Sequence, residues 1–426
     1  MRLRGWLYTR ATRRRRMMEA GSSDISVAIV SSVVGKSPRE VTYSFVFDEA
    51  YRLVQRGVNV HVVRAAVEES SSSYGINFHG IRRRVDAEAF VELLKNLPLY
   101  SPFALLRNPL MLYWENLYAL NISNVVENLR IDLIHAHFAY PEGFSGLIAK
   151  RRTKKPLVVT LHGYDILVEP SVKYGIRLSK RYDALVREVL VNADAVIVAS
   201  RAVFEEAVKL RGRKSGTYLV HNGVDIKRFN PNLNGSLIRK RLGIENKFVV
   251  FSARHHRPVY GLEYLIKAAA LVVKLRSDVV FVIGGEGPLR TYHEKLVEML
   301  NLENNVIFTG RIPRDEMPHY YAASDAVVVP SLQEAWSLVV TEAMASGKPV
   351  VGTRVGGIVD QIIDGYNGFL VPPRDPKAIA EKILWLIDNP DEAKRMGMNG
   401  RRLAEEKFDI EKRIEKIIGI YKELVG

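Results

Sequence analysis

The 426-residue chain has no cysteine, which excludes disulfide bonds and thiolate ligands for a metal ion. It also has no apolar run of the roughly 18 residues that a membrane-spanning helix needs, so no transmembrane span is predicted. The N-terminus is basic, but no apolar stretch follows it, and a secretory signal is not expected. With 47% hydrophobic and 26% charged residues, the composition is that of a globular protein long enough for two domains.

Several catalytic signatures are missing as well. No Asp-x-Asp occurs, which argues against the metal-dependent transferase fold, and no Gly-x-Ser-x-Gly elbow is present. Gly347-Lys348 is followed by Pro349, so it cannot form a phosphate-binding P-loop. Gly285-Glu286-Gly287 follows an apolar stretch like a dinucleotide fingerprint, but Arg290 stands where the third glycine is needed.

The chain has an excess of positive charge, with 62 Lys and Arg against 47 Asp and Glu and a net charge of +15. Such a charge favours anionic partners: a nucleoside diphosphate, an anionic membrane or a nucleic acid. The basic runs lack interleaved aromatic residues that could stack on bases, so no nucleic-acid partner is expected. Solvated surface and electrostatic docking on anionic lipid both stay open for these runs.

From residue 24 onward, short apolar runs rich in Val, Ile and Leu alternate with amphipathic stretches. This alternation is typical of parallel strands that are covered on both faces by helices. The predicted strands are Ile25–Ser31, Val58–Arg64, Ile131–His135, Leu157–Leu161, Ala195–Ala199, Phe248–Ala253, Val279–Ile283, Asn305–Phe308, Ala326–Val329, Pro349–Gly352 and Gly368–Val371. The predicted helices include Phe45–Gln55, Gly143–Arg151, Arg201–Leu210, Leu262–Leu275 and Ala378–Ile387.

The alternation pauses near residue 222, where Asn-Gly and Asn-Pro sequences are typical of turns. The sequence therefore predicts an α/β fold of two doubly wound, Rossmann-like domains, with ligands bound in the cleft that they face. We place a basic tail at 1–23, an N-terminal domain at 24–222 and a C-terminal domain at 223–407. A helix at 408–426 is expected to pack back on the N-terminal domain.

Residues 97–122 interrupt the alternation with apolar and aromatic side chains such as Tyr100, Tyr113 and Trp114. Two interpretations stay open. The segment is either a helical insert packed on the core of the N-terminal domain, or an apolar lip for a lipid-linked acceptor or the membrane interface.

The richest segment runs from 330 to 351 and carries two carboxylates, Glu334 and Glu342. An apolar strand ends before Pro330, a short loop holds Glu334, and a helix is predicted to open near Ser337. The first N–H groups of a helix are unpaired and carry positive partial charge, which makes its start a phosphate site. Seven residues separate the two glutamates, so both can reach one ligand, where carboxylates accept hydrogen bonds from sugar and ribose hydroxyls.

Around this pair the chain closely resembles glycosyltransferase family 4, whose fold is GT-B. The matching motifs are Glu334 and Glu342 as an E-x7-E pair, the run Glu342–Val351, Gly356-Gly357, Asp364–Val371, Asn222–Asp225, Gly284–Pro288, Ile134–His137 and Thr160–Gly163. The resemblance covers residue 25 to the C-terminus and is looser over 36–125. It implies a donor nucleotide on the C-terminal domain, an acceptor on the N-terminal domain, and retention of anomeric configuration.

The resemblance also implies roles for individual residues. His137, Arg254 and Glu334 would be catalytic: His137 faces the reacting sugar, Arg254 neutralises the diphosphate leaving group, and Glu334 binds a hydroxyl of the donor sugar. The acceptor-side candidates are Gly35 and His162. The donor-binding candidates are Gly285, Glu286, Gly287, Arg311, Trp336, Ser337, Leu338, Val339 and Glu342, with Glu342 on the ribose and the amides around Leu338 and Val339 on phosphate.

The chain departs from the family pattern at two places. Glu334-Ala335-Trp336-Ser337 stands where the family has Glu-Gly-Phe-Gly, and side chains at 335 and 337 narrow the approach to a phosphate. Tyr260 stands where the family has a lysine, and tyrosine cannot supply that positive charge. Arg257, His255 or His256 is therefore expected to supply the missing positive charge. Arg257 and Tyr260 are further candidates for binding the diphosphate.

The histidine motifs are also candidates for a metal site. His135 is expected at the carboxyl end of a strand as a core histidine, and His137 one step into the loop. His135, His137 and His162 have no carboxylate at metal-ligand spacing, so neither zinc nor another metal cofactor is expected.

The sequence thus predicts a retaining, metal-independent glycosyltransferase that moves a sugar from a UDP- or GDP-sugar to a hydroxyl of a glycan, a lipid or a small molecule in cell-envelope polysaccharide synthesis. A phosphorylase or nucleotide-sugar epimerase of the same fold and a non-catalytic nucleotide-sugar binder are the alternatives. The expected location is the cytoplasm, with peripheral contact to the inner face of an anionic membrane.

Overall fold

The computed structural model describes residues 25–426 except 33, 36–43, 66–67, 82–84 and 101–107. The predicted basic tail at 1–23 lies outside these residues. Contacts divide the chain into two compact units, and the predicted boundary at 222/223 does not coincide with their division. The first unit comprises residues up to 160, 184–197 and 414–426, and the second comprises 161–183 and 198–413.

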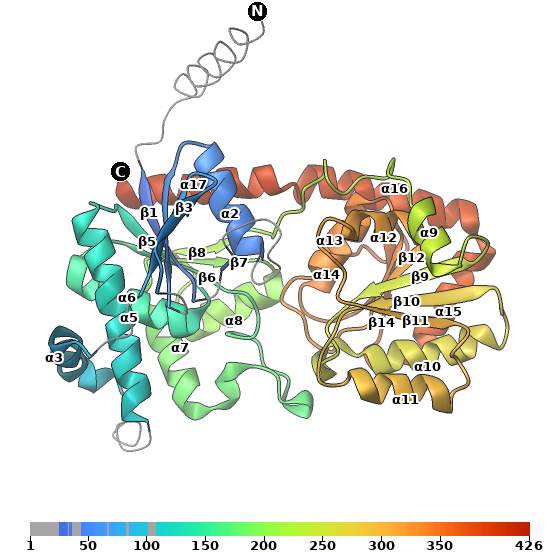
Figure 1. Cartoon of the computed structure of the whole chain (residues 1–426), viewed down its shortest axis with the longest axis horizontal. Coiled ribbons are helices and arrows are strands. Elements are labelled where there is room, and N and C mark those ends of the chain that lie inside the picture. The colour runs from blue at the N-terminus through green and yellow to red at the C-terminus, as the bar shows by residue number, and fades with distance from the viewer. Residues whose placement is uncertain (1–24, 33, 36–43, 66–67, 82–84, 101–107) are drawn as a thin grey trace, which may run out of the picture. The chain divides into compact units, whose positions relative to one another are not determined.

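The first sheet has the strand order β3-β4-β2-β1-β5-β6-β7-β8 (Figure 1). The pairings from β4 across to β7 are parallel, and β3 pairs with β4 in antiparallel orientation. The strands are β1 (Ser26–Val30), β2 (Asn59–Arg64), β3 (Ser71–Ser73), β4 (Ile76–Gly80), β5 (Leu133–His137), β6 (Leu157–Thr160), β7 (Ala195–Val198) and β8 (Thr217–Leu219).

The helices in this half of the sequence include a long one over part of the segment that interrupts the alternation. They are α2 (Ser44–Gln55), α3 (Ala87–Asn96), α5 (Pro109–Asn128), α6 (Phe144–Thr153), α7 (Lys180–Asn192) and α8 (Arg201–Arg211), with short turns η1 (Leu97–Leu99), η2 (Ala139–Gly143), η3 (Pro170–Val172) and η4 (Ile176–Leu178). Leu112, Leu117 and Leu120 of α5 are buried, so this part of the segment packs as a helix on the core.

The second sheet is parallel throughout, with the order β11-β10-β9-β12-β13-β14. Its strands are β9 (Phe248–Ala253), β10 (Val279–Gly284), β11 (Val306–Gly310), β12 (Ala326–Val329), β13 (Val350–Thr353) and β14 (Gly368–Val371). The helices that follow β8 in the chain are α9 (Ser236–Leu242), α10 (Leu262–Val273), α11 (Arg290–Met299), α12 (Met317–Ala323), α13 (Leu338–Ala345), α14 (Ile358–Gln361), α15 (Pro376–Asp388), α16 (Pro390–Lys407) and α17 (Ile410–Val425), with the turn η5 (Pro258–Tyr260).

Alternate residues of the second sheet enter two separate cores. Val249 and Phe251 of β9 belong to the core that α12 and α13 share, whereas Val250 belongs to the core of α10, α11 and α15. Successive side chains of a strand point to opposite faces, so both faces of this sheet are covered by helices. This confirms the interpretation of continuous Val, Ile and Leu runs as doubly covered parallel strands.

The last helix returns to the first unit. Tyr421 of α17 is fully buried and bonds to His135 of β5, and Glu415 pairs with Arg56 beyond the end of α2 at 3.0 Å. Among the described residues, no helix is both long and apolar enough to cross a bilayer.

Candidate active site

Arg254 and Glu334 form a buried ion pair in the second unit. Arg254 follows the last residue of β9, and Glu334 lies in the loop between β12 and α13. Their side chains are 8% and 13% exposed. The Arg254 Nη2 atom donates to three oxygens: Ser331 Oγ at 2.9 Å, Glu334 Oε2 at 2.5 Å and Ser337 Oγ at 3.1 Å. The Arg254 guanidinium therefore links the chain after the carboxyl end of β9 to the loop after β12.

The charges of this cluster are balanced locally. Burial raises the pKa of the Glu334 carboxyl, and the Arg254 guanidinium offsets part of that rise. Tyr260 lies with its ring 5.0 Å from the Arg254 guanidinium carbon, and burial and the Glu334 carboxylate raise the pKa of its phenol. The tyrosine thus gives the guanidinium an aromatic face, in the position where the family has a second cation.

The start of α13 lies beside this ion pair. Ser337 caps the helix by accepting from the Val340 N–H at 3.4 Å, and Gln361 holds both the N–H and the carbonyl of Ser337. Leu338 and Val339 are the first two helical residues, and such amides have no acceptor within their own helix. With the helix dipole and the Arg254 side chain, they provide the positive end that a phosphate group needs.

The chain around residue 335 is tightly packed. A Cβ atom at Gly356 would lie 1.8 Å from the Glu334 carbonyl oxygen, and one at Gly357 would lie 2.1 Å from that of Ala335. The Gly357 N–H donates to the Glu334 carbonyl at 2.9 Å. On the other side, a Cβ at Gly163 would lie 2.8 Å from the Ala335 Cβ. The paired glycines thus fix the path of the loop that carries Glu334.

Glu342 has a partner that the sequence did not suggest. The hydroxyl of Tyr321, from α12, donates to Glu342 Oε2 at 2.8 Å. Tyr321 is fully buried, and burial together with Glu342 raises its pKa well above the usual value, so the phenol stays protonated as a donor. The hydrogen bond orients the carboxylate that we expect at the ribose.

Gly285, Glu286 and Gly287 form a loop that runs directly against the residues after β9. A Cβ at Gly285 would lie 2.0 Å from the Arg254 carbonyl oxygen, and its φ of +124° favours glycine. The His256 N–H donates to the Glu286 carbonyl at 2.9 Å. Arg311 is exposed just after β11, which pairs with β10 ahead of this loop. The glycines therefore allow the close approach that positions Arg254.

The three expected sources of a further positive charge, Arg257, His255 and His256, differ in their fit. His256 is fully buried and bonds to His293 through their Nδ1 atoms at 2.8 Å, and burial lowers the pKa of both imidazoles to about 4. A neutral buried histidine cannot replace the missing lysine, so that expectation was wrong for His256. Arg257 and His255 are exposed. Arg257 lines a cavity of about 290 Å³ with Pro258, Tyr264 and other mostly apolar side chains.

Trp336 lies in the core of the second unit. Its ring stacks on His221 with centroids 4.9 Å apart and meets Phe408 edge-on at 5.1 Å. Only 6% of the residue is exposed. The side chain packs the loop that holds Glu334, and any contact of Trp336 with a donor stays a prediction.

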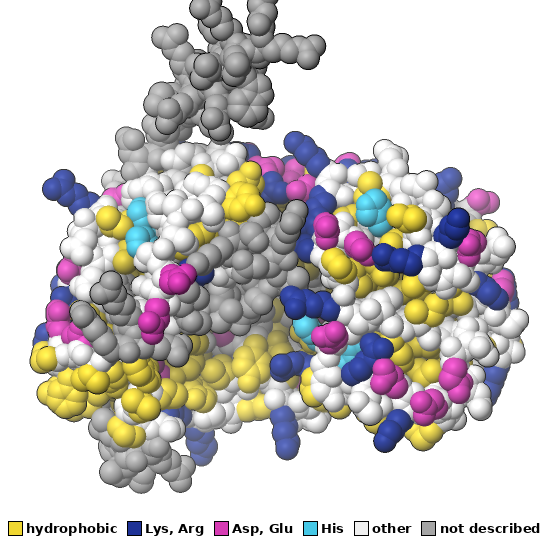
Figure 2. All heavy atoms as spheres, in the orientation of Figure 1, with side chains coloured by type: hydrophobic (Ala, Val, Ile, Leu, Met, Phe, Trp, Pro, Cys, Tyr) yellow, Lys and Arg dark blue, Asp and Glu magenta, His cyan; other side chains and the backbone are white. Residues whose placement is uncertain are grey.

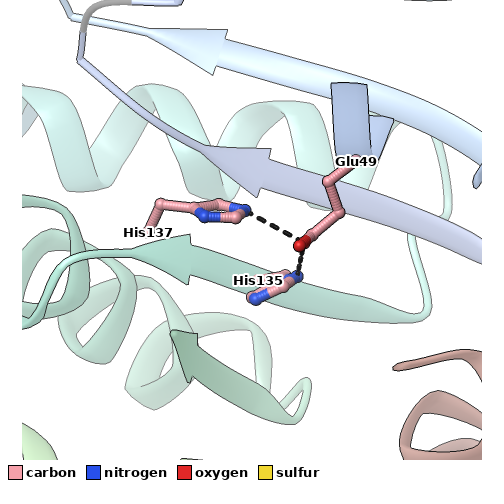
Figure 3. Close-up of side chains that lie close together, drawn as sticks. All are labelled: Glu49, His135 and His137. Carbon is pink, nitrogen blue, oxygen red and sulfur yellow. Dashed lines mark ion pairs between the residues drawn. The ribbon is translucent and has the colours of Figure 1, made fainter. Parts of the chain in front are cut away.

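His137 and His135 lie next to a carboxylate that the sequence spacing did not reveal (Figure 3). Glu49 of α2 places Oε1 at 3.3 Å from His137 Nε2 and at 3.7 Å from His135 Nδ1. The expectation that no carboxylate accompanies these histidines was therefore wrong, because α2 lies almost ninety residues earlier in the chain. β5 extends to His137, and neither imidazole is exposed.

The acceptor-side candidates lie at other strand ends. Gly35 is buried after β1, and His162 is half-buried after β6. The amides of His162 and Gly163 donate to Asp165 Oδ1 at 3.0 and 2.9 Å. Tyr174 is a neighbour of Glu334 that sequence analysis missed, and burial and the Glu334 carboxylate raise the pKa of its phenol.

Comparison with known proteins places this geometry in a family. Residues 236–403 match the model of the glycosyl transferases group 1, and residues 44–228 match that of glycosyltransferase family 4. An uncharacterized glycosyltransferase of Methanocaldococcus jannaschii is 32% identical over 73% of this chain and 81% of its own length. The N-acetyl-alpha-D-glucosaminyl L-malate synthase of Bacillus anthracis is 28% identical over 72% of this chain and 78% of its own.

The fold resembles that of solved glycosyltransferases. The Anabaena protein HepE in complex with UDP-glucose superposes with a TM-score of 0.74 at 22% identity, covering 94% of this chain and all of HepE. A Thermosynechococcus elongatus sucrose-phosphate synthase gives the same TM-score at 23% identity, with 94% of this chain and 99% of that protein covered. The likeness confirms the predicted GT-B architecture of two α/β domains.

Proposed function

The chain belongs to glycosyltransferase family 4, the group 1 glycosyltransferases, and we propose that it transfers a sugar from a UDP- or GDP-sugar to an acceptor hydroxyl with retention of configuration. The observation that carries the proposal is the cluster of Arg254, Glu334 and the start of α13 at the carboxyl ends of β9 and β12. It offers a buried cation and helix amides to a diphosphate and a carboxylate to a sugar. The UDP-glucose complex of HepE supports a nucleotide-sugar donor.

In this proposal the donor binds on the second unit, with its diphosphate at Arg254 and the amides of Leu338 and Val339. Glu334 Oε2 is occupied by Arg254 and Ser331, so Oε1 is the atom that would accept from a sugar hydroxyl. Glu342, held by Tyr321, would accept from the ribose. The positive charge comes from the chain's own residues, and the proposal needs no metal ion.

The proposed reaction takes place on one face of the sugar. The bond between the anomeric carbon and the diphosphate oxygen breaks while the acceptor oxygen bonds to the same carbon. The departing diphosphate takes the proton of the acceptor hydroxyl. Arg254 and the start of α13 stabilise the negative charge that develops on the leaving group, where such preorganised groups have their largest effect.

We also propose that the acceptor is a glycan or lipid handled at an anionic membrane, on the inner face facing the cytoplasm. Apolar side chains gather on the surface around α3 and the beginning of α5 (Figure 2). Val85, Phe90, Leu94 and Leu110 are 93%, 55%, 51% and 65% exposed. Flotation with vesicles of anionic and of neutral lipid tests this contact, because an apolar surface with a basic protein should bind the anionic vesicles more strongly.

A thermal-shift screen across UDP, GDP and ADP and their sugars tests the donor. A ligand that binds only the folded state raises the unfolding temperature, so one nucleotide class should stabilise the protein and the others should not. Transfer is then measured with the stabilising donor and candidate acceptors. Donor turnover that needs phosphate, or no acceptor, would instead indicate a phosphorylase or an epimerase, and binding with no turnover or slow hydrolysis would indicate a non-catalytic binder.

A further inference from the structure

A buried polar cluster in the first unit joins four elements that are distant in sequence. Glu49 comes from α2, His135 and His137 from β5, Thr160 from β6 and Tyr421 from α17. His135 bonds through Nδ1 to the Tyr421 hydroxyl at 2.6 Å and through Nε2 to Thr160 Oγ1 at 2.7 Å. Its ring is tilted by 30° to that of His137, with centroids 4.6 Å apart.

The contacts of the cluster favour a network of hydrogen bonds over a metal site. Glu49, His135 and His137 have the residue types and spacing of a metal site. Both ring nitrogens of His135, however, lie at hydrogen-bond distance from hydroxyl groups. Only Glu49 and His137 would then be left as ligands, whereas protein zinc sites use three or four protein ligands.

Glu49 places a buried carboxylate oxygen against the His137 ring. The Glu49 side chain is 4% exposed, and a buried carboxylate is costly unless positive charge or N–H groups face it. Figure 3 shows both imidazoles directed at one Glu49 oxygen, with His137 Nε2 the nearer at 3.3 Å. A carboxylate oxygen at that distance favours the His137 tautomer that carries its hydrogen on Nε2 and its lone pair on Nδ1.

The backbone directly after His137 is strained. Phe138 has a φ of +78° and a ψ of 143°, a region that side chains other than glycine rarely adopt. The turn that follows carries Glu142, which accepts from the Ser32 N–H after β1 at 3.0 Å. Strain of this kind persists only where the surrounding structure holds it, and it clusters at functional sites.

We propose that Glu49 is a positioning residue for His137: it holds the Nε2 proton and the ring orientation, while Tyr421 and Thr160 hold His135 behind it. The inference rests on the proposed function and on the role that the family resemblance implies for His137, which is to face the reacting sugar. Glu49 touches no substrate and acts through His137. In this proposal α17, which carries Tyr421, helps to hold His135 and His137 in position.

The test compares the wild type with Glu49→Gln, which keeps the shape and removes the charge. Nitrogen NMR of the full-length protein labelled in its histidine rings should show His137 protonated on Nε2 in the wild type and a mixture of tautomers in the variant. The kcat for transfer should fall about tenfold or more, because a misoriented imidazole stabilises the transition state less well. The donor KM should stay within about twofold, because the donor-binding residues lie in the second unit.

Two matched variants separate positioning from stability. Glu92→Gln removes another buried carboxylate, one that pairs with Lys95 and Arg152 away from the histidines, and it should leave kcat and the His137 signals unchanged. Glu49→Asp keeps the charge and should recover part of kcat. Unchanged His137 signals in folded Glu49→Gln would overturn the inference, as would an equal loss of kcat in Glu92→Gln. If the wild type transfers no sugar, the proposed function fails, and the ring-nitrogen signals still decide whether Glu49 positions His137.

Discussion

Replacing Arg254 by methionine should destabilise the second unit and weaken donor binding for separable reasons. The change removes a cation that is 8% exposed and donates to Ser331, Glu334 and Ser337. Breaking a buried pair by removing one partner costs about 3–5 kcal/mol. Glu334 can relieve part of this by taking a proton, because burial already raises its pKa. We therefore expect a loss of about 3 kcal/mol.

The assay is thermal unfolding as a function of pH. A loss of about 3 kcal/mol in a unit of this size lowers Tm by about 6–12 °C. The pKa of Glu334 rises further when Arg254 is absent, so the folded variant favours the protonated carboxyl. The deficit should be smallest at low pH and should grow as the pH rises through that pKa.

A second substitution separates stability from binding. Arg254→Met with Glu334→Gln should recover most of the lost Tm, because no unpaired carboxylate is left buried. Nucleoside diphosphate affinity should stay low in both variants, because the cation for the diphosphate is gone. An unchanged Tm in Arg254→Met, or a double variant no more stable than the single one, would show that the buried ion pair does not stabilise the second unit.

Three further predictions follow from individual contacts. Gly285→Ala should lower the free energy of unfolding by about 3 kcal/mol and weaken nucleotide binding, because its Cβ would lie 2.0 Å from a carbonyl oxygen. Gly243→Ala, at a φ of +67° with open space around it, should lower the free energy of unfolding by only about 1–2 kcal/mol. Tyr321→Phe should weaken nucleotide affinity about 3–10-fold in a calorimetric titration, since Glu342 loses its donor; unchanged affinity would contradict this. Burial lowers the pKa of His61, His256 and His293 to about 4, so the unfolded state takes up more protons below pH 6.5 and Tm should fall between pH 6.5 and 4; a constant Tm would speak against it.

Much of the fold could be predicted because buried parallel strands have a plain sequence signal. The Phe248–Ala253, Ala326–Val329 and Gly368–Val371 strands were predicted at the bounds that the structure has. β3, with the sequence Ser-Ser-Ser, was not predicted, because a polar strand of three residues carries no apolar pattern. β4 and β8 were missed as well, since they are short and partly exposed.

The site was predictable to a more limited extent. Motif resemblance named Arg254, Glu334 and Glu342, but the pairing of Arg254 with Glu334 joins residues 80 positions apart and needs the sheet order. Nothing in the sequence around Tyr321 indicates that it bonds to Glu342, because that contact arises only when α12 packs against α13. Glu49 lies in an ordinary amphipathic helix, where a single glutamate predicts nothing until the sheet places β5 beside it.

The most direct test of the roles of Glu334 and Arg254 is to measure sugar transfer and nucleoside diphosphate affinity for the wild type and for Glu334→Gln. The expected result is that transfer falls by about 100-fold or more while diphosphate binding is retained, because Glu334 acts on the sugar and Arg254 on the diphosphate. Full transfer by a folded Glu334→Gln protein would contradict it.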